Sequence, residues 1–252
     1  MLQAFANGTV FGESYGDGAP QVLWLHGWQR SKADFAAAAT TLAHRGIASV
    51  ALDLPGFGSS PPPPHAGGAR YYSDLVATIL RDDLPRPVVL VGHSFGGRVG
   101  VVLAARHPDH VTGLVLTGVP LLPREGRSTS PLAYRVIRSL SQRGLVSTAR
   151  LEAARQKYGS ADYRQAQGVM RDVLVASVNE RYDDELRQWR GPTVLLWGDG
   201  DSDVPVDVAS RAAELLPSHP HVTVLEGVGH LTPTAAPDAV ASAVAALLGD
   251  AA

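Results

Sequence analysis

Cysteine is absent from this chain of 252 residues. The absence excludes disulfide bonds, a thiol nucleophile and metal sites built on thiolate ligands, and it fits a reducing compartment. Long apolar runs are missing as well, since no stretch approaches the roughly 20 residues that a membrane-spanning helix needs. The first residues also lack the basic and apolar segments of a signal peptide. We therefore expect a cytoplasmic protein with no membrane partner.

Charge of either sign is modest. Charged residues make up 18% of the chain and the formal net charge at pH 7 is −2, so the composition gives no reason to expect nucleic-acid binding. The hydrophobic content of 45% is ordinary for a globular protein with a buried parallel sheet. The length lies near the upper limit for a single hydrophobic core. The oligomeric state is left open.

The most informative segment covers residues 88–97. An apolar stretch rich in β-branched residues predicts a buried strand, which ends in Gly-x-Ser-x-Gly with Ser94 at its centre. Residues 98–106 then predict a helix. This order is typical of a nucleophile elbow, a tight turn that exposes the serine hydroxyl, in which Gly92 and Gly96 avoid collisions with the neighbouring strand and helix. We interpret Ser94 as a catalytic nucleophile rather than as part of an ordinary turn.

In proteins with such an elbow, an acid and then a histidine follow the serine in the chain. Residues 193–197 predict another apolar strand, and the loop after it contains Asp199, Asp201 and Asp203. The three aspartates compete for the role of the acid.

A histidine follows the next predicted strand, residues 221–225, in a glycine-flanked loop. Such a loop can bring His230 over the edge of the sheet toward the serine. An isolated loop histidine is usually a solvated surface residue, but this position in the order of elements favours His230 as the general base.

Several motifs together resemble the α/β-hydrolase family over nearly the whole chain. They are His26-Gly27-Trp28, the segment 52–59 (LDLPGFGS), the elbow, Trp197-Gly198 followed by Asp201 and Val204-Pro205, and Gly229-His230 with Pro237. The resemblance implies an α/β fold with a mostly parallel, doubly wound sheet of about eight strands. It also implies a helical cap inserted after the sixth strand.

The resemblance also selects among the aspartates. In the family pattern the acid stands three residues after the Trp-Gly glycine and four before the proline, which is Asp201. Asp203 is the alternative, and Asp199 is expected to form a turn. Relatives often carry a glutamate between the catalytic histidine and the proline, and this chain has none between His230 and Pro237.

Two backbone N–H groups are expected to stabilise the oxyanion of the reaction. One belongs to Phe95, after the nucleophile and at a helix N-terminus, and the other belongs by resemblance to Trp28. The side chains of Trp28, Phe95 and Leu231 are the candidate walls of the substrate pocket. Plain core packing is the alternative for Trp28 and Phe95.

Strands and helices alternate along most of the chain, which predicts the doubly wound sheet. Residues 9–15 predict an early antiparallel strand, and residues 32–44 and 71–81 predict helices. Residues 121–190 contain no β-rich run, and helical spacing is clearest at 132–145 and 169–178. We therefore expect a core of residues 1–120 and 191–252 and a helical cap of residues 121–190.

The predicted cap carries a charge of +5 and the remainder −7. Five of its arginines lie close together, namely Arg124, Arg127, Arg135, Arg138 and Arg143. One interpretation is the capture of an anionic or carrier-bound substrate, and the other is a solvated basic helix face. The segment from His26 to Gly58 also resembles the pimeloyl-carrier-protein methyl ester esterases, whose caps meet an acidic carrier, although Gln29-Arg30 departs from that pattern.

Other polar residues are expected to be structural. His107 and His110 have no evident third metal ligand, and His93 is expected to pack beneath the elbow. Arg98 suggests a buried ion pair, and Asp53 a structural loop.

The sequence thus predicts a serine hydrolase that cleaves a small-molecule carboxylic ester, thioester or lactone through an acyl-enzyme, with no cofactor and no metal. Two alternatives stay open. One is another Ser-His-Asp reaction, such as carbon–carbon bond hydrolysis, a lyase or a cyclase reaction. The other is a non-catalytic binding protein on the same scaffold.

Overall fold

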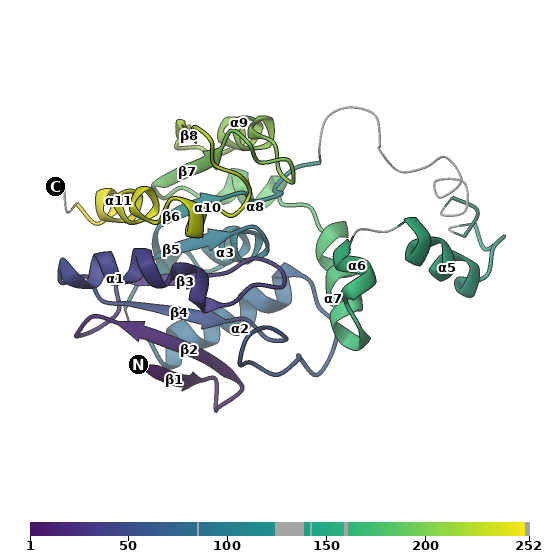
Figure 1. The fold of residues 1–252 in the computed structure, drawn as a ribbon, viewed down its shortest axis with the longest axis horizontal. Helices are drawn as coiled ribbons and strands as arrows, with labels where there is room; N and C mark the ends of the chain where they lie inside the picture. The colour runs from purple at the N-terminus through teal and green to yellow at the C-terminus, as the bar shows by residue number, and fades with distance from the viewer. Residues whose placement is uncertain (85, 124–138, 142, 159–160, 250–252) are drawn as a thin grey trace.

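The protein folds around one eight-stranded sheet with the strand order β1-β2-β4-β3-β5-β6-β7-β8 (Figure 1). A computed structural model describes residues 1–84, 86–123, 139–141, 143–158 and 161–249. The strands are β1 (Leu2–Phe5), β2 (Val10–Tyr15), β3 (Val22–Leu25), β4 (Ser49–Asp53), β5 (Val88–His93), β6 (Val111–Thr117), β7 (Thr193–Gly198) and β8 (Val222–Leu225). The strand β2 pairs antiparallel with β1 and with β4, and β3 to β8 are parallel. The sequence predicted this mostly parallel sheet with an early antiparallel strand.

Helices lie on both faces of the sheet. They are η1 (Lys32–Phe35), α1 (Ala36–His44), α2 (Ala69–Asp82), α3 (Phe95–Arg106), η2 (Pro108–His110), α5 (Thr148–Tyr158), α6 (Ala161–Gln165), α7 (Gly168–Asn179), α8 (Asp183–Gln188), α9 (Val206–Leu215), α10 (Thr232–Ala235) and α11 (Pro237–Leu247). The fully buried β3 shows how the two layers form. Val22 and Trp24 pack in the cluster that contains α1 and α11, whereas Leu23 and Leu25 pack in the cluster that contains α2, α3 and α9.

Some element bounds differ from those predicted. The first strand, β1, carries no apolar alternation and was not predicted; it is largely exposed and is held by its pairing with β2. The helix predicted from residue 98 begins at Phe95, directly after the elbow. The helix predicted over 32–44 starts as a 3₁₀ turn, η1, before α1.

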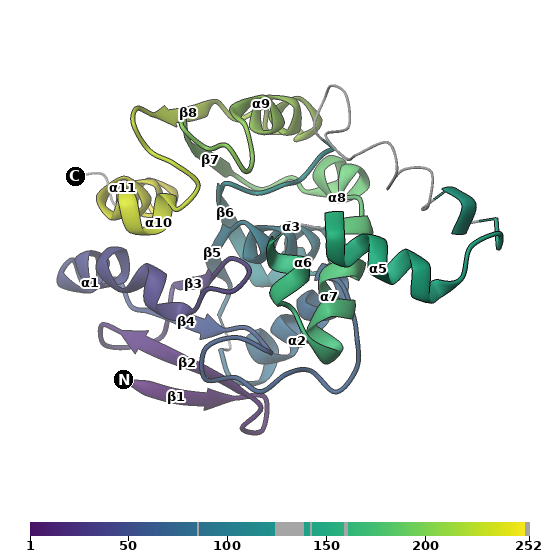
Figure 2. The same cartoon turned by 45° about the vertical axis from the view of Figure 1, so that its right-hand side comes forward.

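Between β6 and β7 the chain forms the helices α5 to α8 and, within the described residues, no strand. In Figures 1 and 2, α5, α6 and α7 stand out from the body of the sheet, whereas α8 packs on α3 and α9. The helix α7 corresponds to the one predicted at 169–178. Of the helix predicted at 132–145, residues 132–138 and 142 lie outside the described part.

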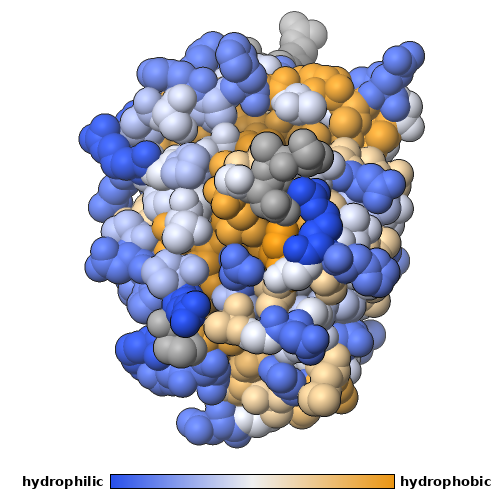
Figure 3. Space-filling model, turned by 90° about the vertical axis from the view of Figure 1, so that its left-hand side faces the viewer, coloured by the Kyte–Doolittle hydropathy of each residue, from blue (hydrophilic) through white to orange (hydrophobic). Residues whose placement is uncertain are grey.

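The face opposite α5 to α7 gathers apolar side chains in its middle, with hydrophilic side chains around them (Figure 3). The helices α1 and α11 lie on this side in Figure 1. Within the described ranges, none of the helices combines the length and apolar character that a bilayer crossing requires.

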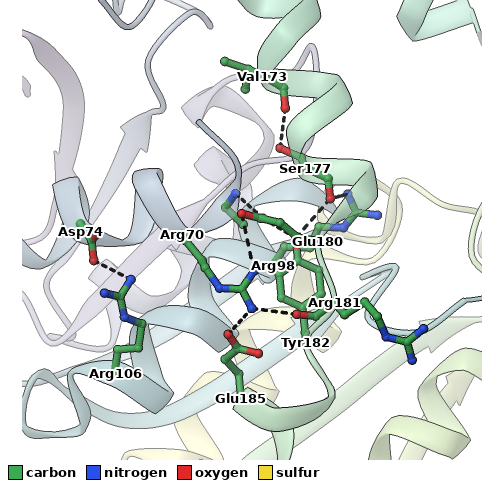
Figure 4. Close-up of polar contacts among 11 residues, drawn as sticks. Arg70, Asp74, Arg98, Arg106, Val173, Ser177, Glu180, Arg181, Tyr182 and Glu185 are labelled. Atoms are coloured by element: carbon green, nitrogen blue, oxygen red, sulfur yellow. Dashed lines mark hydrogen bonds and ion pairs between the residues drawn. The ribbon is translucent and has the colours of Figure 1, made fainter. Parts of the chain in front are cut away.

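Polar contacts attach the end of α7 to the core (Figure 4). The Glu180 carboxylate accepts the N–H of Ala69, at the N-terminus of α2, at 2.7 Å and lies 3.7 Å from the Arg70 guanidinium. Arg70 also donates to Glu185 at 2.6 Å. A carboxylate is favoured at a helix N-terminus, where unpaired N–H groups and the helix dipole meet.

Arg98 of α3 forms a second attachment between the core and α7. It donates to the carbonyl oxygens of Pro120, at 3.2 Å, and Ser177, at 3.1 Å, and its guanidinium lies over the ring of Tyr182. The sequence suggested a buried ion pair, but Arg98 is only partly buried and its partners are carbonyl groups rather than a carboxylate. Because burial disfavours the charged form, the pKa of Arg98 lies below its usual value.

Candidate functional site

The turn between β5 and α3 has the geometry of a nucleophile elbow. Ser94 has a φ of +49°, a region that residues other than glycine rarely adopt and that stores roughly 1–3 kcal/mol of strain. A Cβ on Gly92 would lie 2.5 Å from the Cα of Gly97, and one on Gly96 would collide with the carbonyl of Leu25. The two glycines therefore let the strand and the helix meet closely at the serine.

The structure brings Asp201 and His230 together. The carboxylate Oδ2 of Asp201, in the loop after β7, lies 2.9 Å from Nδ1 of His230, in the loop after β8. Its other oxygen accepts the backbone N–H groups of Asp203, at 2.9 Å, and Val204, at 2.7 Å. The Asp201 side chain is 1% exposed and that of His230 is 20% exposed, so the imidazole retains access to solvent while its acidic partner is enclosed.

The two other aspartates of this loop have different surroundings. Asp199 accepts the backbone N–H of Gly227 at 2.8 Å and so ties the loops after β7 and β8 together. Asp203 contributes its own backbone N–H to Asp201. The carboxylate that bonds His230 is thus the one that the family pattern selects.

His230 packs against the residue that precedes the serine. Its ring centroid lies 4.9 Å from that of His93, whose Nδ1 is 3.0 Å from the carbonyl oxygen of Thr117. Burial and then the neighbouring His230 lower the pKa of His93 to about 3, so this imidazole is neutral near pH 7. On the other side of His230, Gly118 has a φ of +55°, and a Cβ there would lie 3.0 Å from the ring.

A second buried histidine shapes the loop after β3. The Nε2 atom of His26 accepts the N–H of Leu54 at 3.0 Å, which leaves Nδ1 to donate to the carbonyl of Gly27 at 2.7 Å. Burial lowers the pKa of His26 and keeps it neutral. Its carbonyl oxygen also accepts the N–H of Gly96 at 3.0 Å, which joins this loop to the elbow.

The two N–H groups expected to bind an oxyanion belong to residues that touch. The rings of Trp28 and Phe95 meet edge to face with centroids 5.7 Å apart. Among the hydrogen bonds of the described residues, neither the N–H of Trp28 nor that of Phe95 has an acceptor. Both N–H groups therefore keep the capacity to bind an acceptor, as the predicted role requires.

The three residues expected to line the pocket are placed differently. Trp28 borders a cavity of about 430 Å³ that is lined by residues 28–30, 56–58, 165–167 and Met170. Phe95 is buried in the core beside Trp28, and Leu231 is 40% exposed; neither lines this cavity. The sequence analysis missed the lining residues of α6 and α7 because helical spacing does not reveal where a helix docks.

Asp53 is structural, as the sequence suggested. Its buried carboxylate accepts the N–H of Lys32 at 2.8 Å, the Lys32 ammonium at 2.7 Å and the N–H of Ser59 at 2.8 Å. Burial alone would raise its pKa, but these donors hold the pKa of Asp53 below its usual value.

Metal-ligating side chains do not cluster in the described ranges. The rings of His107 and His110 lie 6.4 Å apart, and no three His, Cys, Asp or Glu side chains gather there as a metal site.

Comparisons with known proteins identify the family of this chain. The chain is 30% identical over 226 residues to a pimeloyl-(acyl-carrier protein) methyl ester esterase of Chromobacterium violaceum, which covers 83% of this chain and 86% of the relative. It is 27% identical to a non-heme haloperoxidase of Rhodococcus erythropolis, over 89% of this chain and 90% of that protein.

Among solved structures, the bromoperoxidase of Bacillus anthracis superimposes with a TM-score of 0.76 at 20% identity, over 99% of this chain and 100% of that one. At this identity the likeness shows the fold alone. A family model described as the alpha/beta hydrolase family matches residues 22–243. The protein therefore belongs to the alpha/beta hydrolase family.

Proposed function

We propose that this protein is a serine hydrolase that cleaves a carboxylic ester through an acyl-enzyme intermediate. The observation that carries the proposal is the 2.9 Å contact between Asp201 and His230, with the imidazole packed against His93 at the start of the strained elbow. The relatives named as esterases and lipases support the same reaction class.

In this proposal Ser94 attacks the ester carbonyl carbon and its hydroxyl proton passes to Nε2 of His230. Asp201 accepts a hydrogen bond from Nδ1–H, which keeps Nε2 unprotonated before the attack and stabilises the imidazolium afterwards. The N–H groups of Trp28 and Phe95 stabilise the oxyanion. Collapse breaks the bond to the alkoxide, which leaves as the alcohol with the proton from His230.

Deacylation repeats these steps with water as the nucleophile. His230 removes a proton from the water, the hydroxide attacks the acyl carbon, and Ser94 leaves with the proton returned from His230. The acid is released and the serine hydroxyl is restored. The reaction needs no group beyond these residues.

A different Ser-His-Asp reaction is the second candidate, because one relative is named a haloperoxidase and one structural neighbour a meta-cleavage product hydrolase. The proposed constellation serves these reactions as well, so the substrate decides between them. A non-catalytic role is the third candidate, and the available oxyanion donors speak against it.

The basic interpretation of residues 121–190 stays a prediction. Arg124, Arg127, Arg135 and Arg138 lie outside the described residues, and Arg143 is exposed. Among the arginines described there, Arg171 pairs with Glu152 at 3.2 Å. The esterase relative of Chromobacterium violaceum, by its name, acts on a carrier-bound ester, which keeps a carrier-bound substrate among the candidates.

The test compares the wild type, Ser94→Ala and the control Ser210→Ala on nitrophenyl esters of increasing acyl length. Ser210 lies on the exposed side of α9, and its hydroxyl bonds only its own helix. We expect Ser94→Ala to lower turnover at least about 1000-fold, and Ser210→Ala to behave as wild type. Turnover that survives Ser94→Ala would contradict the proposal.

Labelling with a fluorophosphonate separates the candidate functions. Labelling at Ser94 together with ester turnover supports the hydrolase. Labelling without turnover of any ester indicates an activated serine with a different reaction, such as carbon–carbon bond cleavage. A protein that is neither labelled nor active would fit the binding role.

A further inference from the structure

The cavity of about 430 Å³ is built by three segments that are far apart in the chain. Residues 28–30 follow β3 and carry the proposed oxyanion donor, residues 56–58 form the turn after β4, and residues 165–167 with Met170 form the corner between α6 and α7. One wall of the cavity is thus the loop that stabilises the oxyanion in the proposed reaction, and the opposite wall comes from the insertion between β6 and β7.

The uncharged polar side chains that line this cavity are amides. Gln29, Gln165 and Gln167 border it, all three are exposed, and their side-chain amides make no hydrogen bond within the described part of the chain. Gln29 also has a φ of +54°, an uncommon conformation for a side-chain-bearing residue that tends to occur at functional sites. Each amide can both donate and accept a hydrogen bond.

The positive charge of the one charged lining residue is balanced by a neighbouring carboxylate. Arg30 donates to Asp34 through Nε at 2.8 Å and Nη2 at 2.6 Å, a two-point contact that also raises the pKa of Arg30. Such a pair presents little net charge to the cavity. An anionic substrate group would therefore meet no uncompensated cation among the lining residues.

The remaining lining is apolar and close-packed. The rings of Trp28 and Phe57 meet edge to face at 4.9 Å, and Met170 lies directly on Gly56, where a Cβ would overlap its side chain. These apolar residues form a floor that can accommodate methylene groups of a substrate, and the three glutamines border the same cavity.

Side chains of α6 and α7 pack against the loop after β3 beside this cavity. Tyr163 and Ala166 form a small buried cluster with Leu174, and Trp28 packs against that cluster. The segment that carries Gln165 and Gln167 is therefore in direct contact with the loop that carries Gln29.

We propose that the cavity is a substrate subsite for an uncharged polar group, an amide or a hydroxyl, carried on a short chain by the ester. Gln165 and Gln167, at the junction of α6 and α7, recognise this group together with Gln29, and the apolar side chains of the cavity contact the chain. The proposal rests on the ester-hydrolase function and deepens it by naming a substrate class.

The test uses three esters of equal chain length that end in a methyl, a primary amide or a carboxylate group. They are prepared in two series, with the variable end on the acyl side or on the alcohol side of the ester. The proteins compared are the wild type, the double variant Gln165→Leu/Gln167→Leu and the control Gln188→Leu, an equally exposed glutamine of α8 that does not line the cavity.

In one of the two series, we expect the kcat/KM of the wild type to be higher for the amide-ended ester than for the methyl-ended ester. Since an uncharged hydrogen bond changes an equilibrium by about threefold to tenfold, the double variant should lose about that factor for each amide, mainly through KM. The control should keep the preference. The carboxylate-ended ester should be the poorest substrate, because its charge would meet no unpaired cation in the lining.

Either of two outcomes overturns the subsite: a preference that the double variant retains in both series, or a wild-type preference for the carboxylate-ended ester. Binding of the amide-ended ester to Ser94→Ala, measured by calorimetry, reports on the subsite without turnover. If that binding depends on Gln165 and Gln167 while the wild type hydrolyses none of the esters, the proposed function fails and the subsite stands.

Discussion

The imidazole of His93 lies against that of His230, with ring centroids 4.9 Å apart and a tilt of 51° between the rings. His93 stands beside the elbow serine, and its Nδ1 is bonded to the carbonyl of Thr117. A charged His93 would oppose the imidazolium that the proposed mechanism forms on His230. The burial that keeps His93 neutral therefore serves the proposed chemistry as well as the packing.

Neutral His93 makes the stability of the fold depend on pH. Its pKa of about 3 in the folded state lies below the ordinary value of 6.5, so between these values the unfolded chain binds more protons. The stabilising contribution is thus complete above pH 6.5 and is lost as the pH falls toward 3. Between pH 5.5 and 4.5 the free energy of unfolding of the wild type should fall with decreasing pH. In His93→Asn this fall should be smaller, by about 1 kcal/mol per pH unit.

Urea denaturation at several pH values measures this difference. The comparison uses the slope with pH, so a constant loss of packing energy in the variant does not affect it. Parallel slopes would mean that His93 does not resist protonation in the folded protein.

Asp201 and Asp203 can be separated by matched amide substitutions. Asp201→Asn keeps the shape but removes the charge that faces His230 and favours the wrong imidazole tautomer, so we expect turnover to fall about 1000-fold or more. Asp203 contributes its backbone N–H to Asp201, which Asp203→Asn retains, and we expect a loss below about tenfold. Steady-state rates on one nitrophenyl ester decide between them. A larger loss in Asp203→Asn would assign the acid to residue 203.

Two glycines near the site should differ in their tolerance of alanine. At Gly92 the added methyl group meets the backbone of the elbow helix at 2.5 Å, whereas at Gly229 it meets no atom within 4 Å. We expect Gly92→Ala to destabilise the fold by about 1–3 kcal/mol and Gly229→Ala by less than about 0.5 kcal/mol. Thermal unfolding measures both. Equal effects would show that the elbow can open by moving the helix.

Arg98 and Arg106 lie on the same helix in very different surroundings (Figure 4). Arg98→Met leaves the carbonyl group of Pro120 without its side-chain donor, whereas the carbonyl group of Ser177 keeps the hydroxyl of Tyr182, and we expect a loss of about 1–3 kcal/mol in the free energy of unfolding. Arg106→Met removes a solvent-exposed pair with Asp74, worth less than about 1 kcal/mol.

Limited proteolysis provides a second measurement on the Arg98 variant. Because Arg98 ties α7 to the core, cleavage between residues 121 and 190 should become faster in Arg98→Met than in Arg106→Met. Equal cleavage rates would show that the contacts of Glu180 hold α7 in place by themselves.

The sequence alone determined the alternating order of strands and helices that builds the core of this protein. Apolar β-branched runs alternating with helical segments can fold only as a buried parallel sheet, because their side chains need cover on both faces. The elbow was predictable for a related reason: only glycine fits at residues 92 and 96 when a strand and a helix meet at Ser94. The family pattern selected Asp201, and the structure places its carboxylate on His230.

Tertiary structure decided the relationships that no local pattern encodes. The contact of His93 with His230, the carbonyl partners of Arg98 and the amide-lined cavity each join segments that are far apart in the chain. Such contacts depend on how helices dock and how loops bend over the sheet edge, which is set by packing across the whole core. The sequence therefore specified the proposed reaction centre through short motifs, whereas only the folded chain determined what surrounds it.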